Sequence, residues 1–282
     1  MKPLTLGTRG SDLALTQSRL VASALRAAHP DLRVQEKIIR TVGDRRLDVP
    51  LHAVGPLDKG LFTKELEEAL LDGTIDFAVH SLKDLPTENP PGLVLAAILE
   101  RADPADLLVS KTPGGLDGLP PHSTVGTSSP RRKNQLLHFR PDLTVVDIRG
   151  NVPTRLRKLA ESDTLAATVL AKAGLDRLGH DIIPPQLHAT VITEMLPAPG
   201  QGAIAVQTRD ADTATRALFQ PLHHEDTARC VTAERDVLRQ QGGGCHLPLG
   251  VLATINDGNL TVTATLFHHD GPRQLLNPKS KI

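Results

Sequence analysis

The sequence predicts an α/β protein with two doubly wound lobes and a smaller α+β unit after them. Short runs rich in β-forming residues alternate with helical patterns over most of the chain, which is typical of sheets covered by helices on both faces. Two segments rich in proline, glycine or charge, 100–106 and 196–202, interrupt this alternation. Beyond about Leu222 one helical segment is followed by two strands, which indicates a different kind of domain.

The period of the apolar residues places the elements of the first lobe. Segment 61–71 carries apolar residues at i, i+4, i+7 and i+8 from Phe62, which indicates one face of a helix. The predicted strands are 4–6, 34–40, 75–79 and 93–98, and the other predicted helix is 12–27. Segment 41–60 shows no period, and a long stretch of this kind in a compact domain is typical of a lid or an active-site loop.

The two interrupting segments predict a hinge. A strand at 203–207 follows the second segment and is expected to return to the sheet of the first lobe, so that two crossovers join the lobes into a clamshell with a ligand in its cleft. The third unit is expected to hold a helix at 226–239 and a hairpin of strands 249–255 and 260–267. The predicted domains are 1–99 with 200–219, then 100–199, then 220–282.

Composition argues against several classes of protein. The net charge is zero and aromatic residues make up 2% of the chain, which argues against a nucleic-acid partner. No apolar run approaches the roughly 18 residues of a membrane span, and the first residues show no apolar signal core, so we expect a cytoplasmic protein. We expect no metal site, for two reasons. The two cysteines form no CxxC motif, and the histidine pairs at 223–224 and 268–269 have no further ligands at a matching spacing.

Three times a strand is followed by small or hydroxyl residues, an arginine and a helix start. These turns are 7–12, 126–132 and 147–155. Ser11, Ser129 and Asn151 are suitable N-caps, and Pro130 suits a first helical turn. Free N–H groups, the helix dipole and a nearby guanidinium favour an anion at such a position. One such turn is most simply an ordinary cap, but three of them predict a small polyanionic ligand.

The run 79–86 follows a predicted strand and ends at Pro86, so it lies at the carboxyl end of a strand, where α/β sheets bind ligands. Asp84 beside Lys83 is either an ordinary exposed pair or a functional carboxylate. Among many cations Asp84 should stay ionised, and it could then stabilise a developing cation or accept an N–H bond.

The two cysteines have different surroundings. Cys230 shares a helical stripe with Ala233 and Val237, which predicts a small buried core residue. Cys245 follows three glycines that free the backbone, so its sulfur could be presented into a cleft. His246 adjoins Cys245, but adjacency in sequence is not the geometry of a catalytic cysteine–histidine pair.

Together these motifs resemble the porphobilinogen deaminase (hydroxymethylbilane synthase) family. The matching stretches run through nearly the whole chain, and their order and spacing make the resemblance specific. They are 8–11, 59–67, 79–86, 126–132, 149–155, 171–178, 199–202 and 243–250. The resemblance implies two periplasmic-binding-protein-like doubly wound domains joined by a two-strand hinge, and a small α+β C-terminal domain that carries the cysteine.

The resemblance also implies a reaction and a site. Cys245 would carry a dipyrromethane cofactor through a thioether, and four porphobilinogen molecules would be added to it with loss of ammonia. Asp84 would be the catalytic residue. The implied cofactor-binding residues are Lys83, Asp84, Ser81, Thr127, Ser128, Ser129, Arg131, Arg132 and Gly150. The implied substrate-binding residues are Arg9, Ser11, Arg149, Arg155 and Arg177, and the implied lid residues are Lys59 and Phe62. Arg177 is alternatively an ordinary arginine on a helix surface.

Two other interpretations account for part of the sequence. A non-catalytic clamshell that binds small polycarboxylates would explain the hinge and the arginines, but it gives no role to Cys245 or Asp84. A cysteine-nucleophile hydrolase would give Cys245 a role, but a thioether on its sulfur would block that chemistry. The favoured interpretation is a monomeric transferase of tetrapyrrole biosynthesis that acts on porphobilinogen, without a nucleic-acid or membrane partner.

Overall fold

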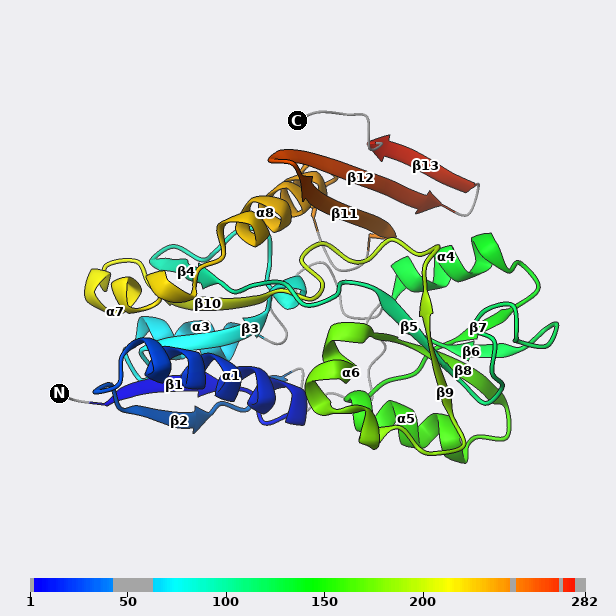
Figure 1. The fold of residues 1–282 in the computed structure, drawn as a ribbon, viewed down its shortest axis with the longest axis horizontal. Coiled ribbons are helices and arrows are strands. Elements are labelled where there is room, and N and C mark those ends of the chain that lie inside the picture. The colour runs from blue at the N-terminus through cyan, green and yellow to red at the C-terminus, as the bar shows by residue number, and fades with distance from the viewer. Residues whose placement is uncertain (1–2, 43–62, 244–246, 269–270, 277–282) are drawn as a thin grey trace.

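The computed structural model describes residues 3–42, 63–243, 247–268 and 271–276. Two five-stranded sheets and one three-stranded sheet form three units, which Figure 1 shows side by side. Each of the two larger units is an α/β unit with a five-stranded sheet and helices packed on it, as the sequence predicts. Within the described residues, no helix combines the length and apolarity that crossing a membrane requires.

The first sheet has the strand order β2-β1-β3-β10-β4. Its strands are β1 (Leu4–Thr8), β2 (Val34–Ile38), β3 (Phe77–Ser81), β4 (Leu93–Ile98) and β10 (Ile204–Arg209). β1 pairs in parallel with β2 and β3, whereas β10 runs antiparallel between β3 and β4. The prediction that a strand near 203–207 returns to this sheet is therefore confirmed.

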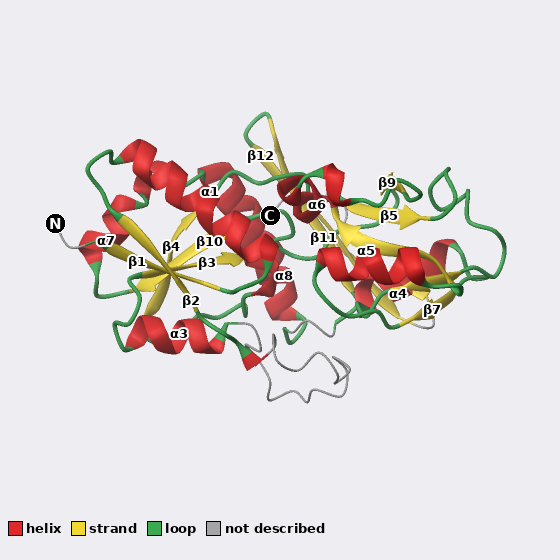
Figure 2. Cartoon of the chain, turned by 90° about the horizontal axis from the view of Figure 1, so that it is seen from below, coloured by secondary structure: helices red, strands yellow, loops and turns green. Residues whose placement is uncertain are grey.

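Helices cover both faces of the first sheet, as Figure 2 shows for α1 and α3. Apolar residues of α1 (Asp12–Ala28) pack on one face, and those of α3 (Lys64–Leu71) pack on the other. The Ser11 hydroxyl caps α1 by accepting a hydrogen bond from the Ala14 N–H at 3.4 Å, so the predicted cap is confirmed. A short helix, α7 (Thr213–Leu218), closes this unit.

The predicted strand 75–79 lies two residues too early. Ile75 is buried, but its N–H donates to the Ala69 carbonyl at the end of α3 rather than to a neighbouring strand. β3 starts at Phe77 and continues to Ser81, and a 3₁₀ turn, η2 (Leu82–Asp84), follows it directly. An apolar residue that packs under a helix has the same sequence signature as one in a strand, which explains the error.

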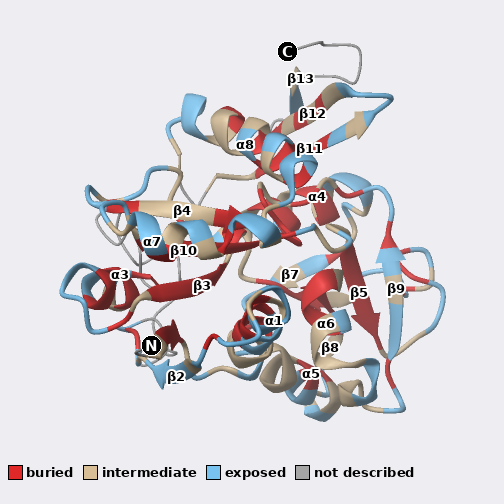
Figure 3. Ribbon diagram, turned by 60° about the vertical axis from the view of Figure 1, so that its left-hand side comes forward, coloured by how far each residue is buried: buried red, intermediate tan, exposed pale blue. Residues whose placement is uncertain are grey.

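The second sheet has the order β7-β6-β8-β5-β9. Its strands are β5 (Asp106–Ser110), β6 (Thr124–Gly126), β7 (Thr144–Val146), β8 (Leu165–Ala171) and β9 (His188–Ile192). The helices of this unit are α4 (Pro130–Phe139), α5 (Val152–Glu161) and α6 (Lys172–Leu178), with the 3₁₀ turn η3 (His180–Ile182) after α6. Alternate residues of β5 face the two helical layers, so β5 is buried throughout, as Figure 3 shows. The caps predicted at Ser129 and Asn151 are both present.

The third unit packs α8 (Glu225–Gln240), preceded by the 3₁₀ turn η4 (Gln220–Leu222), on a three-stranded sheet. The sheet contains β11 (Leu249–Asn256), β12 (Asn259–His268) and β13 (Gly271–Leu276). The predicted helix and hairpin are confirmed, and Cys230 is buried among apolar residues of α8 and this sheet as expected. The sequence did not predict β13, because a short edge strand with a proline lacks clear alternation.

The chain crosses between the two larger units twice, first between β4 and β5 and then between β9 and β10. Both crossovers contact the third unit at Glu234. This buried carboxylate of α8 pairs with Arg101 of the first crossover at 2.7 Å. It also accepts hydrogen bonds from the Gly200 N–H of the second crossover and from the Ala253 N–H of β11, both at 2.8 Å. One side chain therefore ties the hinge to the third unit.

We expect Glu234→Ala to lower the free energy of unfolding by about 3–5 kcal/mol, because it leaves Arg101 buried without its counter-charge. Thermal and urea unfolding of the purified chain would measure the change. The matched control is Asp210→Ala, which breaks an exposed ion pair with Arg216 and should cost about 1 kcal/mol or less. Equal losses in the two variants would contradict the role given to Glu234.

Candidate functional site

The candidate catalytic carboxylate lies on a short turn that two units hold. Asp84 ends the 3₁₀ turn after β3, and its side chain is exposed. The guanidinium of Arg235, from α8 of the third unit, donates to the carbonyls of Leu82, Leu85 and Pro86 around this turn. Burial lowers the pKa of Arg235. The third unit thus fixes the backbone that presents Asp84.

A small pocket of about 60 Å³ lies on one side of Asp84, at the carboxyl ends of β1 and β3. The pocket is lined by α1 and the turn before it, by the residue that precedes α3, and by β3 and the 3₁₀ turn after it. The lining residues are Arg9, Ser11, Leu13, Ala14, Gln17, Thr63, Val79, His80, Ser81 and Asp84. Gln17 and Ser81 hydrogen-bond each other across it at 2.9 Å. Burial, together with the charge of Arg9, lowers the pKa of His80 to about 4, so the imidazole is neutral near pH 7.

A much larger cavity of about 1180 Å³ lies on the other side of Asp84, where all three units meet. Lys83 and Asp84 line it from the first unit, and residues 127–134 and Arg155 line it from the second. Pro199 and Gln201 of the second crossover and Leu247, Leu249 and Phe267 of the third unit complete the wall together with other apolar residues. Asp84 borders both the pocket and this cavity.

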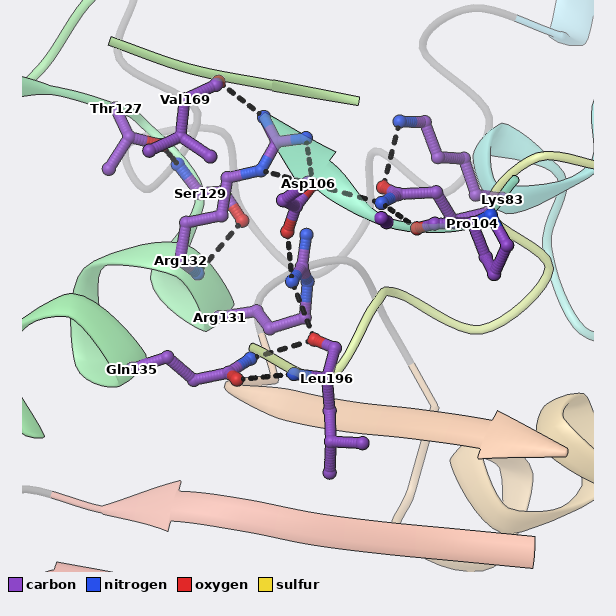
Figure 4. A network of polar contacts seen from close by, with 12 residues as sticks. Lys83, Pro104, Asp106, Thr127, Ser129, Arg131, Arg132, Gln135, Val169 and Leu196 are labelled. Atoms are coloured by element: carbon purple, nitrogen blue, oxygen red, sulfur yellow. Dashed lines mark hydrogen bonds and ion pairs between the residues drawn. The ribbon is translucent and has the colours of Figure 1, made fainter. Parts of the chain in front are cut away.

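A buried ion network forms one wall of the cavity (Figure 4). Asp106, fully buried at the start of β5, pairs with Arg131 at 2.7 Å and with Arg132 at 2.8 Å. Burial alone would raise the pKa of Asp106, but the charges and hydrogen bonds of the two arginines outweigh it and hold the pKa well below its usual value. Arg132 also donates to the Val169 carbonyl, and Arg131 donates to that of Leu196.

Lys83 faces the same network from the first unit. Its ammonium donates to the side-chain oxygen of Gln201 at 3.2 Å, and the Gln201 amide nitrogen donates to Asp106 at 2.9 Å. Burial and the positive charges of Arg132 and Arg131 lower the pKa of Lys83 to about 8, although the charges of Asp84 and Asp106 oppose the shift. Lys83, Arg131 and Arg132 together form what we call the cationic wall of the cavity. This wall carries more positive than negative charge, and near neutral pH it favours an anion.

Arg155 lies in the first turn of α5 and lines the same cavity as the cationic wall. Arg155 donates to the Gly150 carbonyl at 2.8 Å, and burial lowers its pKa to about 10. Gly150 has φ of +123°, and a Cβ there would lie 2.6 Å from the Thr154 side chain. Only glycine fits this bend, which returns the chain toward the N-terminus of α5.

The structure brings most of the predicted site residues together. Lys83, Asp84, Thr127, Ser128, Ser129, Arg131, Arg132 and Arg155 line the large cavity, and Arg9, Ser11, Ser81 and Asp84 line the small pocket. Arg149 and Gly150 lie in the β7–α5 turn but are not among the residues that line either space. Cys245 and the predicted lid residues Lys59 and Phe62 lie outside the described residues.

Arg177 has a different setting from the other arginines. It lies on α6 and donates to the Gly202 carbonyl of the second crossover at 2.6 Å, and burial lowers its pKa. It does not line either space within the described part of the chain. This contact ties the second unit to the crossover.

Sequence analysis did not predict several residues of the site. Asp106 pairs with Arg132, which is 26 residues away, whereas Gln201 and Arg235 act through partners 95 and 150 residues away. Asp106 offered one usable signal, since an acidic residue that opens an otherwise apolar strand needs a buried cation nearby. Gln201 and Arg235 offered none, because each resembles an ordinary loop or helix-surface residue.

The hydroxyl residues of the second turn shape it as well as line the cavity. The Ser129 hydroxyl accepts from the Arg132 N–H, the Thr127 hydroxyl accepts from the Ser129 N–H, and the Ser128 hydroxyl donates to the Ile148 carbonyl. These bonds hold the β6–α4 turn in place. Each hydroxyl that accepts such a bond keeps its own proton for a ligand.

Comparison with known proteins identifies the family. A family model described as "Porphobilinogen deaminase, dipyromethane cofactor binding domain" matches residues 4–217, and one described as "Porphobilinogen deaminase, C-terminal domain" matches residues 228–282. The chain belongs to the porphobilinogen deaminase family. It is 50% identical to the porphobilinogen deaminase of Syntrophomonas wolfei subsp. wolfei over 272 residues, which cover 96% of this chain and 87% of that protein.

Two further relatives carry the same name. Identity is 49% over 278 residues with the protein of Moorella thermoacetica, which covers 98% of this chain and 86% of the relative. It is 47% over 269 residues with that of Syntrophobacter fumaroxidans, which covers 95% and 85%. The chain is therefore a transferase that condenses porphobilinogen head to tail into hydroxymethylbilane with release of ammonia, and its cofactor is dipyrromethane.

The cavity fits a dipyrromethane. The cofactor is built from two substrate units, each of which carries an acetate and a propionate, so it brings several carboxylates. At the cationic wall Asp106 is the carboxylate that pairs with Arg131 and Arg132, and Lys83 forms no ion pair among the described residues. The buried Arg131 Nε also has no hydrogen-bond partner among the described residues. Carboxylates at this wall would balance the charge, and the apolar residues that also line the cavity suit pyrrole rings.

Proposed function

We propose that Asp84 is the catalytic residue and that it acts where the small pocket opens beside the large cavity. The single observation that supports this is that Asp84 lines both spaces. A carboxylate in that position can face a substrate in the pocket and a growing chain in the cavity at once. Arg9 and Ser11 of the pocket would receive the substrate carboxylates, as the capped turn at the start of α1 favours an anion.

The proposed chemistry uses the charge of Asp84. When the C–N bond of the substrate aminomethyl group breaks, its electron pair leaves with ammonia and positive charge spreads over the pyrrole ring. An anionic oxygen that accepts the pyrrole N–H would stabilise that charge as it develops. The cofactor, when bound, supplies the nucleophilic pyrrole carbon at the end of the chain. The neutral imidazole of His80 adds no opposing charge to the pocket.

We propose that the cofactor is held by Lys83, Arg131 and Arg132, with Ser81, Thr127, Ser128, Ser129 and Gly150 as further contacts, and attached to Cys245. Leu247, two residues after Cys245 in the sequence, lines the large cavity, which supports attachment there. Arg149, Arg155 and Arg177 would serve carboxylates of the growing chain, and Lys59 and Phe62 would belong to a lid. The setting of Arg155 beside the cationic wall supports its part in this assignment.

We further propose a cytoplasmic monomer without a nucleic-acid or membrane partner. Residues from all three units of the chain line the large cavity together, which supports a site built within one protomer. A reducing compartment would keep both cysteines as thiols before the cofactor is attached. Light scattering should return a mass near 30.2 kDa plus the cofactor, and a dimer mass would contradict this proposal.

We keep the domain division 1–99 with 200–219, 100–199 and 220–282 as a proposal. The membership of the three sheets supports it, because β10 lies in the first sheet and β11 to β13 form the third. Hydrogen exchange should protect each of the three units cooperatively. Exchange in which β10 opens together with the second sheet would contradict the division.

Replacing Asp84 tests its catalytic role. We expect Asp84→Asn to lower kcat by at least about 10²–10³-fold with an unchanged melting temperature, because the amide keeps the shape but removes the charge. The rate of porphobilinogen consumption would measure the effect. The matched control is Glu88→Gln, an exposed carboxylate in the loop beyond the turn, which should keep the wild-type rate. A near-normal rate in Asp84→Asn would refute the assignment.

Intact mass tests the attachment site. The purified protein should weigh more than its chain by two linked pyrroles, and Cys245→Ser should weigh only as much as its chain. Cys230→Ala is the matched control, because Cys230 is buried in the core of the third unit and should not affect loading. An adduct that persists in Cys245→Ser, or disappears in Cys230→Ala, would contradict attachment at Cys245.

A further inference from the structure

Gln201 lies on the second crossover and is completely buried, yet its polar atoms reach both lobes. Its side-chain oxygen accepts from Lys83 of the first lobe at 3.2 Å. Its amide nitrogen donates to the Pro104 carbonyl on the first crossover at 2.7 Å and to Asp106 of β5 at 2.9 Å. Its backbone carbonyl accepts from Arg101 at 2.8 Å.

The orientation of this amide is fixed by its partners. Asp106 and the Pro104 carbonyl can only accept hydrogen bonds, so they require the NH₂ group of Gln201. The oxygen must then point the other way, toward Lys83, which can donate in either protonation state. A flipped amide would set its oxygen against two other oxygens and its NH₂ against an ammonium.

Lys83 has few other ways to be held in place. Within the described part of the chain, the hydrogen bond that its ammonium makes is the one to Gln201. The nearby charges are those of Arg132, Asp84, Asp106 and Arg131. The arginines repel it, and no carboxylate forms an ion pair with it among the described residues. The side chain would be poorly placed without a neutral acceptor at this point.

We propose that Gln201 is a positioning residue, which sets the Lys83 ammonium of the first lobe against the Asp106–Arg131–Arg132 network of the second. It does so from the hinge itself, because it also bonds the first crossover at Pro104. The cofactor-binding cations of the two lobes then keep one alignment across the hinge. This inference rests on the proposed role of Lys83, Arg131 and Arg132 in holding the cofactor.

A neutral amide suits this position better than a carboxylate. A carboxylate at this position would form an ion pair with Lys83 and neutralise a charge that the cofactor needs. It would also be repelled by the carboxylate of Asp106. The amide dipole instead orients the ammonium and leaves its charge to the ligand. Lys83 is thus held in place and remains available to an incoming carboxylate.

The test begins with the titration of Lys83 in the full-length apoprotein, from cells that cannot make porphobilinogen. The rate of Lys83 acylation against pH, followed by peptide mass spectrometry, should show a midpoint near pH 8 in the wild type. Gln201→Met keeps the length of the side chain and removes the acceptor, so the ammonium form loses its hydrogen bond. We expect the midpoint to fall by about half a unit to one unit.

The same variants are then loaded with porphobilinogen, and the covalent adduct is followed by mass. We expect Gln201→Met to load about tenfold more slowly than the wild type, because Lys83 is no longer aligned. Gln201→Asn keeps the amide but is one methylene shorter, so it cannot span Lys83 and Asp106, and it should show the same two changes. It keeps the proposal testable if Gln201→Met does not fold.

Gln135→Met is the matched control. Gln135 is equally buried and bonds the same crossover through the Leu196 N–H and carbonyl, but it contacts neither Lys83 nor Asp106. It should lower stability and leave the Lys83 midpoint and the loading rate unchanged. A wild-type midpoint in both Gln201 variants, or an equal shift in Gln135→Met, would overturn the proposal.

Lys83→Met separates this inference from the function on which it rests. Normal loading in Lys83→Met would refute the cofactor role of Lys83, whatever the Gln201 variants show. Slow loading in Lys83→Met with normal loading in Gln201→Met would leave the cofactor role intact and refute the positioning role of Gln201. Slow loading in both supports the two together.

Discussion

The site depends on the buried ion pairs that join Asp106 to Arg131 and Arg132. A guanidinium does not lose its proton in a protein, so two arginines can be buried in one place only with a counter-charge. Asp106 supplies it from the first residue of β5, immediately after the first crossover. Since one carboxylate serves two arginines with Lys83 nearby, positive charge remains unbalanced along the cavity wall. That imbalance prepares the wall for a ligand with carboxylates.

The two crossovers that form the hinge contact this network and also a second network centred on Glu234. Glu234 holds both crossovers to the third unit through Arg101 and the Gly200 N–H. Gln201 belongs to both networks, because its backbone carbonyl accepts from Arg101 and its side chain joins Lys83 to Asp106. The crossovers therefore do more than link the lobes. They bring a cation of the first lobe to the cations of the second, and they are bonded to the third unit through Glu234.

Two carboxylates of the site have opposite settings. Asp106 is buried, fully used by its arginines and unable to take part in chemistry on a substrate. Asp84 is exposed on a rigid turn, where it borders the small pocket and the large cavity. Arg235 fixes that turn through its carbonyl groups and leaves the carboxylate itself untouched. The first carboxylate builds the cationic wall, and the second is the one that we propose meets the charge that forms when ammonia leaves.

The sequence by itself determined the local features of this protein. Ser11, Ser129 and Asn151 cap their helices as predicted, because a cap acts over a few residues. The strand after the second crossover joins the first sheet as predicted, because the two interrupting segments mark where the chain passes between the lobes. The tertiary structure alone decided the partners of Asp106, Gln201 and Glu234. These contacts join residues far apart in the chain, and no local pattern records which buried charge a carboxylate or an amide will meet once the units have packed.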